Sequence, residues 1–277
     1  MKKYVPLLAA IVIVVVLAIL ASTSCSSQPQ QEIPQEEIPT STENLTQSMN
    51  IYYSASQGYL VPITRQVASS DNMAQAALDL LHDTSANWTD ASSLGVMPTL
   101  PEGATATVSV SGGIAQVDLS GFVCTDADSE KLAISSMTAT LLDMPQIDVV
   151  HYTVNGKAAA LLPFGTSIAD TVTSLAVNAE QEALSVSAGE SVSQVRLAFY
   201  DSANDLLVPV TRSVTGSNDL SAIMTELAKG PAEGSTLTSA IPESCELLGV
   251  SKTEDTAIID MSESFSNLSA QEMTTAA

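Results

Sequence analysis

The sequence predicts an α+β fold: two tandem small αβ sandwich domains that follow an N-terminal membrane anchor and a disordered tether. Three observations predict it. A basic and then apolar segment opens the chain, a polar stretch follows, and the remainder contains one ordered set of landmarks twice. The length agrees, because 277 residues suffice for about two domains of ordinary size.

Residues 1–25 form the predicted anchor. Two lysines follow the first residue, the stretch 5–21 is entirely apolar, and small residues at 22–24 lead to Cys25. This order is typical of an export signal, and it resembles the signal peptide of bacterial lipoproteins, although Ser stands at 22 where that signal prefers Leu. We therefore expect lipidation at Cys25. The length of the apolar stretch leaves an uncleaved, single-pass helix as the alternative. Either anchor would hold the rest of the chain on the extracytoplasmic face of the cell membrane.

Residues 26–48 form the predicted tether. They are rich in Ser, Gln, Pro, Glu and Thr and contain few apolar side chains. Such a composition buries too little apolar surface to fold, so we expect a disordered, extended segment that provides reach.

An internal repeat occupies the remaining chain. LVPITR at 60–65 recurs as LVPVTR at 207–212, and VDLS at 117–120 recurs as IDMS at 259–262. Several landmarks in one order and at nearly constant spacing indicate duplication.

The repeat sets the domain boundaries. We expect the first domain at residues 49–164, a linker at 165–192 and the second domain at 193–277. Too few residues follow IDMS to match the last helix and strand of the first copy, so the second domain is expected to be C-terminally incomplete.

The first half of copy one predicts two strands and a helix. A short strand covers 51–53, and an extended segment covers 58–67, in which Pro62 suits an edge strand. Asp71 is expected to cap a helix over 73–83, because the apolar residues there follow helical spacing.

The second half of copy one predicts a hairpin, a long helix and a closing strand. The hairpin joins 105–110 to 114–119 across a Ser-Gly-Gly turn, the helix covers 126–142, and the strand covers 147–154. Loop 84–97 is assigned no element. The expected order is β-β-α-β-β-α-β, with the helices on one face of a sheet.

The second copy repeats the beginning of this order. It predicts a helix over 219–229, which Gly230 and Pro231 end, and a hairpin of 246–250 with 257–261.

The charge balance excludes one class of partner. The chain has 31 Asp and Glu against 9 Lys and Arg, a net charge of −22. Nucleic acids are bound through clustered Lys and Arg, so we expect no nucleic-acid partner.

The landmarks resemble the GerMN domain family, and their tandem arrangement is similar to GerM-like spore germination and sporulation lipoproteins. In the first copy the resemblance depends on Tyr53 with LVPITR, VDLS and the late Val-Asn-Gly at 154–156. In the second copy it depends on Tyr200 with LVPVTR and IDMS. It covers about residues 50–164 and 195–277, and it departs from the family at 83–84, where Gly-Pro is favoured.

The resemblance implies a role without catalysis. Family members are membrane-attached, and a structural or assembly role in an envelope complex, with a ring-forming partner complex, is expected in sporulation or germination. The resemblance transfers no catalytic residue, cofactor or metal site, so the chain is not expected to be an enzyme.

The repeated polar residues have structural roles as the first expectation. Arg65 and Arg212 are equivalent, and each is expected to form an ion pair with a nearby acid, with contact to a protein partner as the alternative. Asp118 and Asp260 are also equivalent, and each is expected in a turn or cap.

The remaining reactive residues form no catalytic or metal-binding pattern. His82 and His151 lack the spacing of a metal site. Cys124 and Cys245 lie at different places in the repeat, so we expect buried free thiols, with an interdomain disulfide as the alternative.

Two other functions stay open on sequence grounds. A ligand-binding cell-envelope lipoprotein, for glycans or cations, would need a concave acidic or aromatic site between the domains. A wall-modifying enzyme would need convergent carboxylates or a metal, which the sequence does not suggest.

Overall fold

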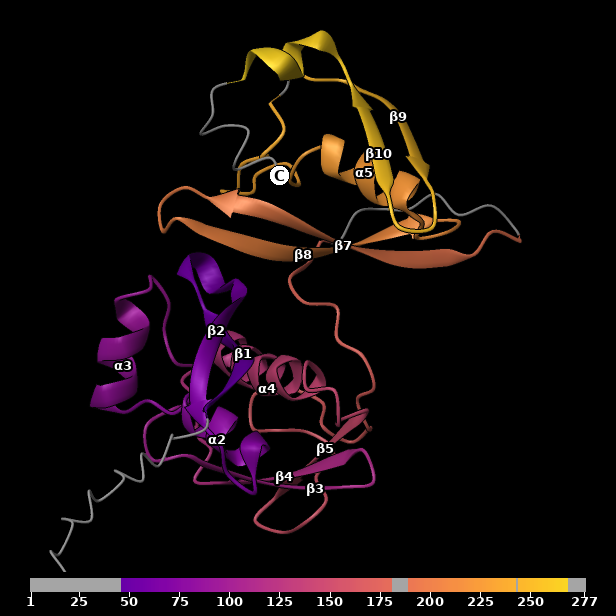
Figure 1. Ribbon diagram of the computed structural model, residues 1–277. Coiled ribbons are helices and arrows are strands. Elements are labelled where there is room, and N and C mark those ends of the chain that lie inside the picture. The colour runs from indigo at the N-terminus through magenta and orange to yellow at the C-terminus, as the bar shows by residue number, and fades with distance from the viewer. Residues whose placement is uncertain (1–45, 181–188, 243, 269–277) are drawn as a thin grey trace, which may run out of the picture. The chain divides into compact units, whose positions relative to one another are not determined.

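The computed structural model describes residues 46–180, 189–242 and 244–268, all within one compact unit of the chain. The predicted anchor with Cys25 and most of the predicted tether lie outside the described residues, as does everything after Leu268. Among the residues that the structure describes, no helix is long and apolar enough to cross a membrane. The α+β class is confirmed (Figure 1).

The first repeat contains two sheets and three α-helices. Its elements are β1 (Thr46–Ser54), the 3₁₀ turn η1 (Ser56–Gly58), β2 (Leu60–Ala68), α2 (Met73–Asp79), α3 (Ser85–Ser92), β3 (Thr105–Ser111), β4 (Ile114–Ser120), α4 (Ala127–Leu142) and β5 (Val149–Val154). Strands β1 and β2 form an antiparallel hairpin. Strand β4 pairs antiparallel with β3 and parallel with β5.

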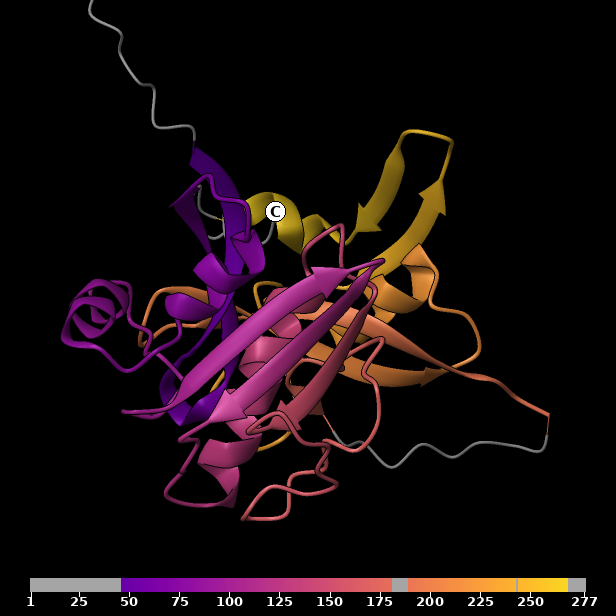
Figure 2. The ribbon, with the colours of Figure 1, turned by 90° about the horizontal axis from the view of Figure 1, so that it is seen from below.

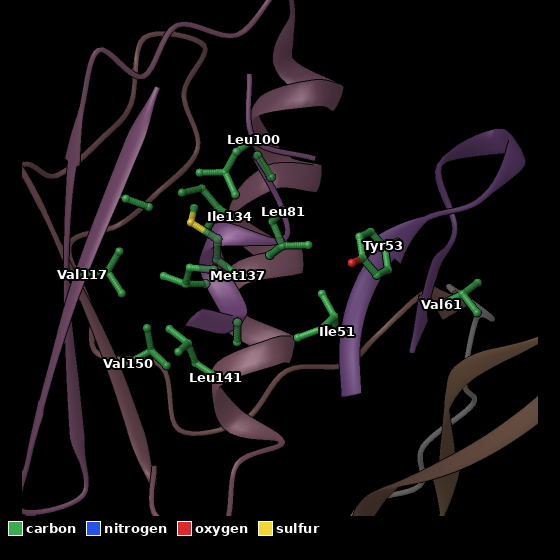
Figure 3. Close-up of a cluster of buried hydrophobic side chains, with 14 of the residues drawn as sticks. Ile51, Tyr53, Val61, Leu81, Leu100, Val117, Ile134, Met137, Leu141 and Val150 are labelled. Carbon is green, nitrogen blue, oxygen red and sulfur yellow. The ribbon is translucent and has the colours of Figure 1, made fainter. Parts of the chain in front are cut away.

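Helix α4 of the first repeat lies between its two sheets, with α2 beside it. Helix α4 contacts β1 and β5, and α2 contacts β3 and α4. Figure 3 shows Met137 and Leu141 of α4 between Val117 and Val150 of the three-stranded sheet and Ile51 of β1. The expected arrangement, with helices on one face of a single sheet, is therefore replaced by a three-layer β-α-β sandwich.

The composition of α4 explains the extra layer. From Ala133 onward almost all residues of this helix are buried, including Ala133 and Met137, each fully buried, and the hydroxyl-bearing Ser136 and Thr140. A helical segment without a polar face is covered on all sides. The small hydroxyls also serve the strand beside them, because the Tyr52 N–H donates to Thr140 Oγ1 (3.0 Å) and Ser136 Oγ donates to the Tyr52 carbonyl.

Helix α2 is shorter than the predicted helix 73–83, and its cap is Asn72 rather than Asp71. Asn72 Oδ1 accepts the N–H of Gln75 at 3.0 Å. The chain leaves the helix after Asp79 and forms a second helix, α3, in the loop where the sequence predicts no element. Thr84 caps α3 by accepting the Asn87 N–H at 3.2 Å.

Strand β1 begins at Thr46, inside the predicted tether. Residues Thr46 to Ser48 pair with Gln66 to Ala68 of β2. Backbone pairing extends this strand although its first side chains are polar and exposed, which is why composition alone placed the boundary later.

The second repeat has a similar layered order. Its elements are β6 (Ala179–Glu180), β7 (Val192–Asp201), β8 (Leu206–Thr215), α5 (Leu220–Ala228), β9 (Leu247–Lys252), β10 (Ala257–Met261) and η2 (Glu263–Asn267). Strand β8 lies in the middle of the sheet β6-β8-β7, and β9 pairs with β10. Helix α5 contacts both β7 and β9, and Figure 2 shows the β9–β10 hairpin beside it.

The helix and hairpin predicted for the second copy are confirmed. Asp219 caps α5 by accepting the N–H of Ala222 at 3.0 Å, and Lys229 is its C-cap. The residues that would complete this repeat lie outside the described part of the chain, so its expected incompleteness stays a prediction.

Candidate functional site

The candidate site is the joint between the two repeats, where strands β2 and β8 carry the repeated LVP motif and contact each other. Each motif contains a proline, which has no backbone N–H to donate. In β2, Pro62 lies opposite Tyr52, whose own N–H and carbonyl bond to α4. This pair therefore requires no bond from Pro62, and the proline is tolerated.

Pro209 is tolerated for a different reason. It lies in the central strand β8, but the short strand β6 pairs only with Thr211 and Arg212. The neighbour of the Pro209 carbonyl on this side is the side-chain amide of Asn178, which donates to it at 2.7 Å.

Asn178 links the two motifs directly. Its Oδ1 accepts the N–H of Leu60 at 2.8 Å, and its Nδ2 donates to the Leu60 carbonyl at 2.8 Å as well as to Pro209. Its backbone is left-handed, with φ of 48°, a conformation that Asn adopts more readily than most residues. One amide thus satisfies backbone groups of both repeats.

A second link joins Arg196 of β7 to Tyr52 of β1. Arg196 Nη2 donates to the Tyr52 hydroxyl at 2.7 Å, and its guanidinium carbon lies 5.9 Å from the ring centroid. The hydroxyl donates to Asp143 Oδ1 at 3.2 Å, and Asn50 donates to Oδ2 at 3.0 Å. Burial raises the pKa of Tyr52; the positive Arg196 opposes this and the negative Asp143 adds to it.

Apolar packing accompanies these bonds. A single cluster of buried side chains includes Ile51 and Val61 of the first repeat and Phe199 and Val208 of the second. The joint is therefore held both by hydrogen bonds and by a shared core.

The predicted ion pairs of Arg65 and Arg212 are confirmed, in different settings. Arg65 pairs with Asp90 of α3, and the side chain of Arg65 is 20% exposed. Arg212 is 1% exposed; its Nε donates to Glu180 Oε2 at 2.9 Å and its Nη1 to Glu226 Oε2 at 3.2 Å.

The alternative role of these arginines, contact with a partner, stays a prediction. The geometry distinguishes the two candidates, because Arg212 Nη2 also donates to the Gly230 carbonyl at 2.9 Å and the side chain is enclosed. Arg65 is partly exposed and could contact a partner in the structure as it stands. Arg212 is enclosed and could do so only if the second repeat rearranged.

Of the turn or capping role predicted for Asp118, the capping role is confirmed: the residue lies within β4, and its carboxylate bonds to the turn at 155–156. Its Oδ1 accepts from Thr153 Oγ1 and from the Gly156 N–H, both at 2.7 Å. Asp260 of β10 is exposed, and no bond of its carboxylate defines a comparable turn in the described residues.

The cysteines and histidines are placed apart. Cys124 and Cys245 are free and buried, as the first expectation had it, and burial raises the pKa of the Cys124 thiol to about 11. His151 Nδ1 bonds to Gln116 Oε1 at 2.9 Å. Within the described ranges, no group of three or more His, Cys, Asp or Glu residues could hold a metal ion. The proposed lipidation site, Cys25, lies outside those ranges.

Sequence reasoning missed three residues of the joint and its surroundings. Asn178 and Glu180 lie in the stretch predicted as a linker, and Arg196 lies outside the repeated landmarks. No repeat signal marks them, because Asn178 and Glu180 lie between the two copies and Arg196 is not among the landmarks that recur.

Comparisons with known proteins agree with this architecture. Residues 50–160 and 196–277 match the family model described as Germane: Sporulation and spore germination. The spore germination protein GerM of Bacillus subtilis (strain 168) is 27% identical over 211 residues, which are 74% of this chain and 57% of the relative. The chain thus spans little more than half of that relative's length.

Solved structures extend the comparison to the fold. The tandem GerMN domains of the sporulation protein GerM from Bacillus subtilis give a TM-score of 0.67 at 24% identity, covering 84% of this chain and 85% of that chain. The first GerMN domain of the same protein, at 28% identity and a TM-score of 0.41, covers 46% of this chain and 98% of that chain.

The matched residues include both copies of the LVP motif and both strands of the joint, and they amount to well over half of the chain. The predicted resemblance is therefore confirmed: the chain belongs to the Germane family of sporulation and spore germination proteins, and it is built of tandem GerMN domains.

Proposed function

We propose that this chain is a non-catalytic, membrane-anchored extracytoplasmic protein and a structural component of an envelope complex in sporulation or germination. The observation that carries the proposal is the joint. Asn178, the Arg196–Tyr52 pair and a shared apolar core connect the two repeats. A part that holds two binding surfaces at a fixed spacing benefits from such a connection, because preorganisation lowers the entropic cost of assembly.

The family and its relatives support the sporulation context. GerM of Bacillus subtilis is named a spore germination and a sporulation protein. The anchor, the assembly role and the ring-forming partner complex are proposals for this chain.

The test begins with the anchor. Membranes from the source cell are cross-linked, and proteins that co-purify with the chain are identified for the wild type, Cys25→Ala and the control Cys245→Ala. The proposal expects large membrane-complex subunits with the wild type and the control, and their loss with Cys25→Ala. A chain that comes out alone and monomeric from wild-type membranes would contradict the assembly role.

The joint supplies the second arm of this test. Asn178→Gly removes the amide that bridges the repeats and keeps a residue suited to positive φ. The assembly proposal expects this variant to reach the membrane normally and to co-purify less complex. Unchanged co-purification would show that the fixed spacing of the repeats is not what the complex uses.

A further inference from the structure

A recess opens beside the joint, with a volume of about 390 Å³. We call it the joint recess. Its wall includes the end of α4, the segment after α4, the stretch 173–177 and Arg196 of β7. The residues that matter for its chemistry are Asp143, Ile147, Asp148, Leu175 and Arg196.

The positive charge of the joint recess is only partly used. Arg196 is exposed, and one of its N–H groups donates to the Tyr52 hydroxyl. A guanidinium carries five N–H groups, and the other N–H groups of Arg196 have no hydrogen-bond partner among the described residues. They can accept a bidentate carboxylate or a similar anion.

One carboxylate of the joint recess is also free. Both oxygens of Asp143 accept bonds from within the first repeat, from Tyr52 and Asn50. Asp148 differs, because its backbone N–H bonds to the Gly113 carbonyl at 2.8 Å while its carboxylate has no donor in the described part of the chain.

The absence of a side chain at Gly113 leaves space for the Asp148 carboxylate. A Cβ added at Gly113 would come within 2.5 Å of Asp148 Oδ2, closer than real atoms approach. The glycine therefore leaves room for this carboxylate at the wall of the recess.

These charges together select a class of ligand. A simple anion would meet the carboxylates of Asp143 and Asp148, and a simple cation would meet the guanidinium of Arg196. A molecule with one ammonium and one carboxylate satisfies both free groups, and its body must be small, because Ile147 is buried and Leu175 is only half-buried at the wall. We propose that the joint recess binds a small zwitterion: an amino acid or a short peptide with free ends. This binding function is separate from the proposed assembly role.

The test compares three probes of nearly equal size. Isothermal titration calorimetry is performed on the full chain in detergent micelles with L-alanyl-L-alanine, with its N-acetyl derivative and with its C-terminal amide. We expect saturable binding of the free dipeptide, and about tenfold weaker binding of each capped probe, since a lost charge-assisted hydrogen bond is worth about that factor or more. No saturable heat up to about 10 mM dipeptide, or equal binding of all three probes, would overturn the proposal.

Two matched variants place the ligand in the recess. Asp148→Asn removes a carboxylate that bonds to no described group, so the variant keeps its melting temperature and binds the dipeptide about tenfold more weakly. The N-acetyl probe, which lacks the ammonium, should bind this variant and the wild type alike. The control is Asp255→Asn, which makes the same charge change in the exposed turn between β9 and β10. If the control weakens binding as much as Asp148→Asn, the attraction is general and the site assignment fails.

Discussion

Arg65 and Arg212 hold the same position in the two copies of the LVP motif, and their surroundings differ. Arg65 lies on β2, which has one strand partner, and it pairs with Asp90, whose side chain is 51% exposed. Arg212 lies on β8, which has strands on both sides, and its acidic partners Glu180 and Glu226 are 13% and 10% exposed.

Two elements beside β8 account for this difference. Strand β6 brings Glu180 opposite Arg212, and α5 supplies Glu226 together with its backbone carbonyl. The aromatic ring of Phe199 lies below the guanidinium, 5.8 Å from its central carbon. The same motif residue is thus a surface charge in one repeat and part of the interior in the other, because neighbours outside the motif decide its burial.

The largest effect is expected from Arg212→Met. Removal of one partner of a buried ion pair costs about 3–5 kcal/mol; here Glu180 loses its cation, while Glu226 keeps Lys229, whose Nζ lies 2.5 Å from Glu226 Oε1. Denaturant unfolding of the variant should show this loss in the free energy of unfolding. A loss equal to that of Arg65→Met would contradict the comparison.

A companion variant distinguishes the loss of the Arg212 ion pairs from the cost of the carboxylates that remain buried without Arg212. Glu180→Gln and Glu226→Gln, added to Arg212→Met, remove the two carboxylates left behind. Part of the lost stability should return, because replacement of a whole buried ion network is far less costly than removal of one member.

The next effect concerns the joint. Asn178→Gly deletes the bonds to Leu60 and Pro209 and leaves backbone groups of two strands without their partner, which costs about 1–3 kcal/mol. Hydrogen exchange should become faster at the Leu60 amide. The matched control is Asn155→Gly, since Asn155 also has positive φ, at 50°, but does not bridge the repeats. Equal losses in both variants would mean that the amide of Asn178 contributes nothing specific.

Several features of the fold were predictable because they depend on local pattern. Helix 219–229 has a capping Asp and a Gly-Pro stop, and the hairpin of β3 and β4 alternates around a Gly-Gly turn. The repeat also supported the strands, first helix and hairpin by their second occurrence. Those signals lie within a few residues of the structure that they specify.

The features that the sequence did not reveal depend on distant neighbours. Helix α4 is central because two sheets pack against it. Arg212 is enclosed because β6, a strand of two residues, lies beside it. Asn178 makes its bonds to residues far away in the chain, at 60 and 209. The sequence predicts a linker at 165–192, around Asn178, and no local pattern indicates that its side-chain amide joins the two repeats.

The two repeats also differ in how they stabilise a buried carboxylate, and the pH dependence of stability tests this difference. Glu130 is 1% exposed, and it accepts the N–H groups of Phe164 and Thr166, both at 2.9 Å. Burial alone would raise its pKa, and the hydrogen bonds from Phe164 and Thr166 outweigh burial, so the pKa lies below its ordinary value of 4.5. The first repeat thus compensates its buried acid with backbone N–H groups, where the second repeat uses a guanidinium.

The sign of the pH effect follows from that direction. A folded-state pKa below the unfolded value stabilises the protein above about pH 4.5, and the stabilisation is lost as pH falls through the folded pKa. Glu130→Gln should lower the melting temperature near pH 7, and the gap to the wild type should close below about pH 4. The exposed Glu102→Gln is the control and should show no such gap. A gap that persists at low pH would mean that the charge of Glu130 is not what holds the 164–166 loop.

The smallest effect is expected from Arg65→Met. The pair with Asp90 is partly exposed, and such pairs contribute about 0–1 kcal/mol. Added salt screens exposed charges, so the small difference from the wild type should shrink further at high ionic strength, while the loss in Arg212→Met should not. If Arg65 is a partner contact, this variant separates the two roles, because it would unfold like the wild type and yet co-purify less of the envelope complex. A large loss of stability would instead place Arg65 among the interior charges and remove the difference between the two repeats.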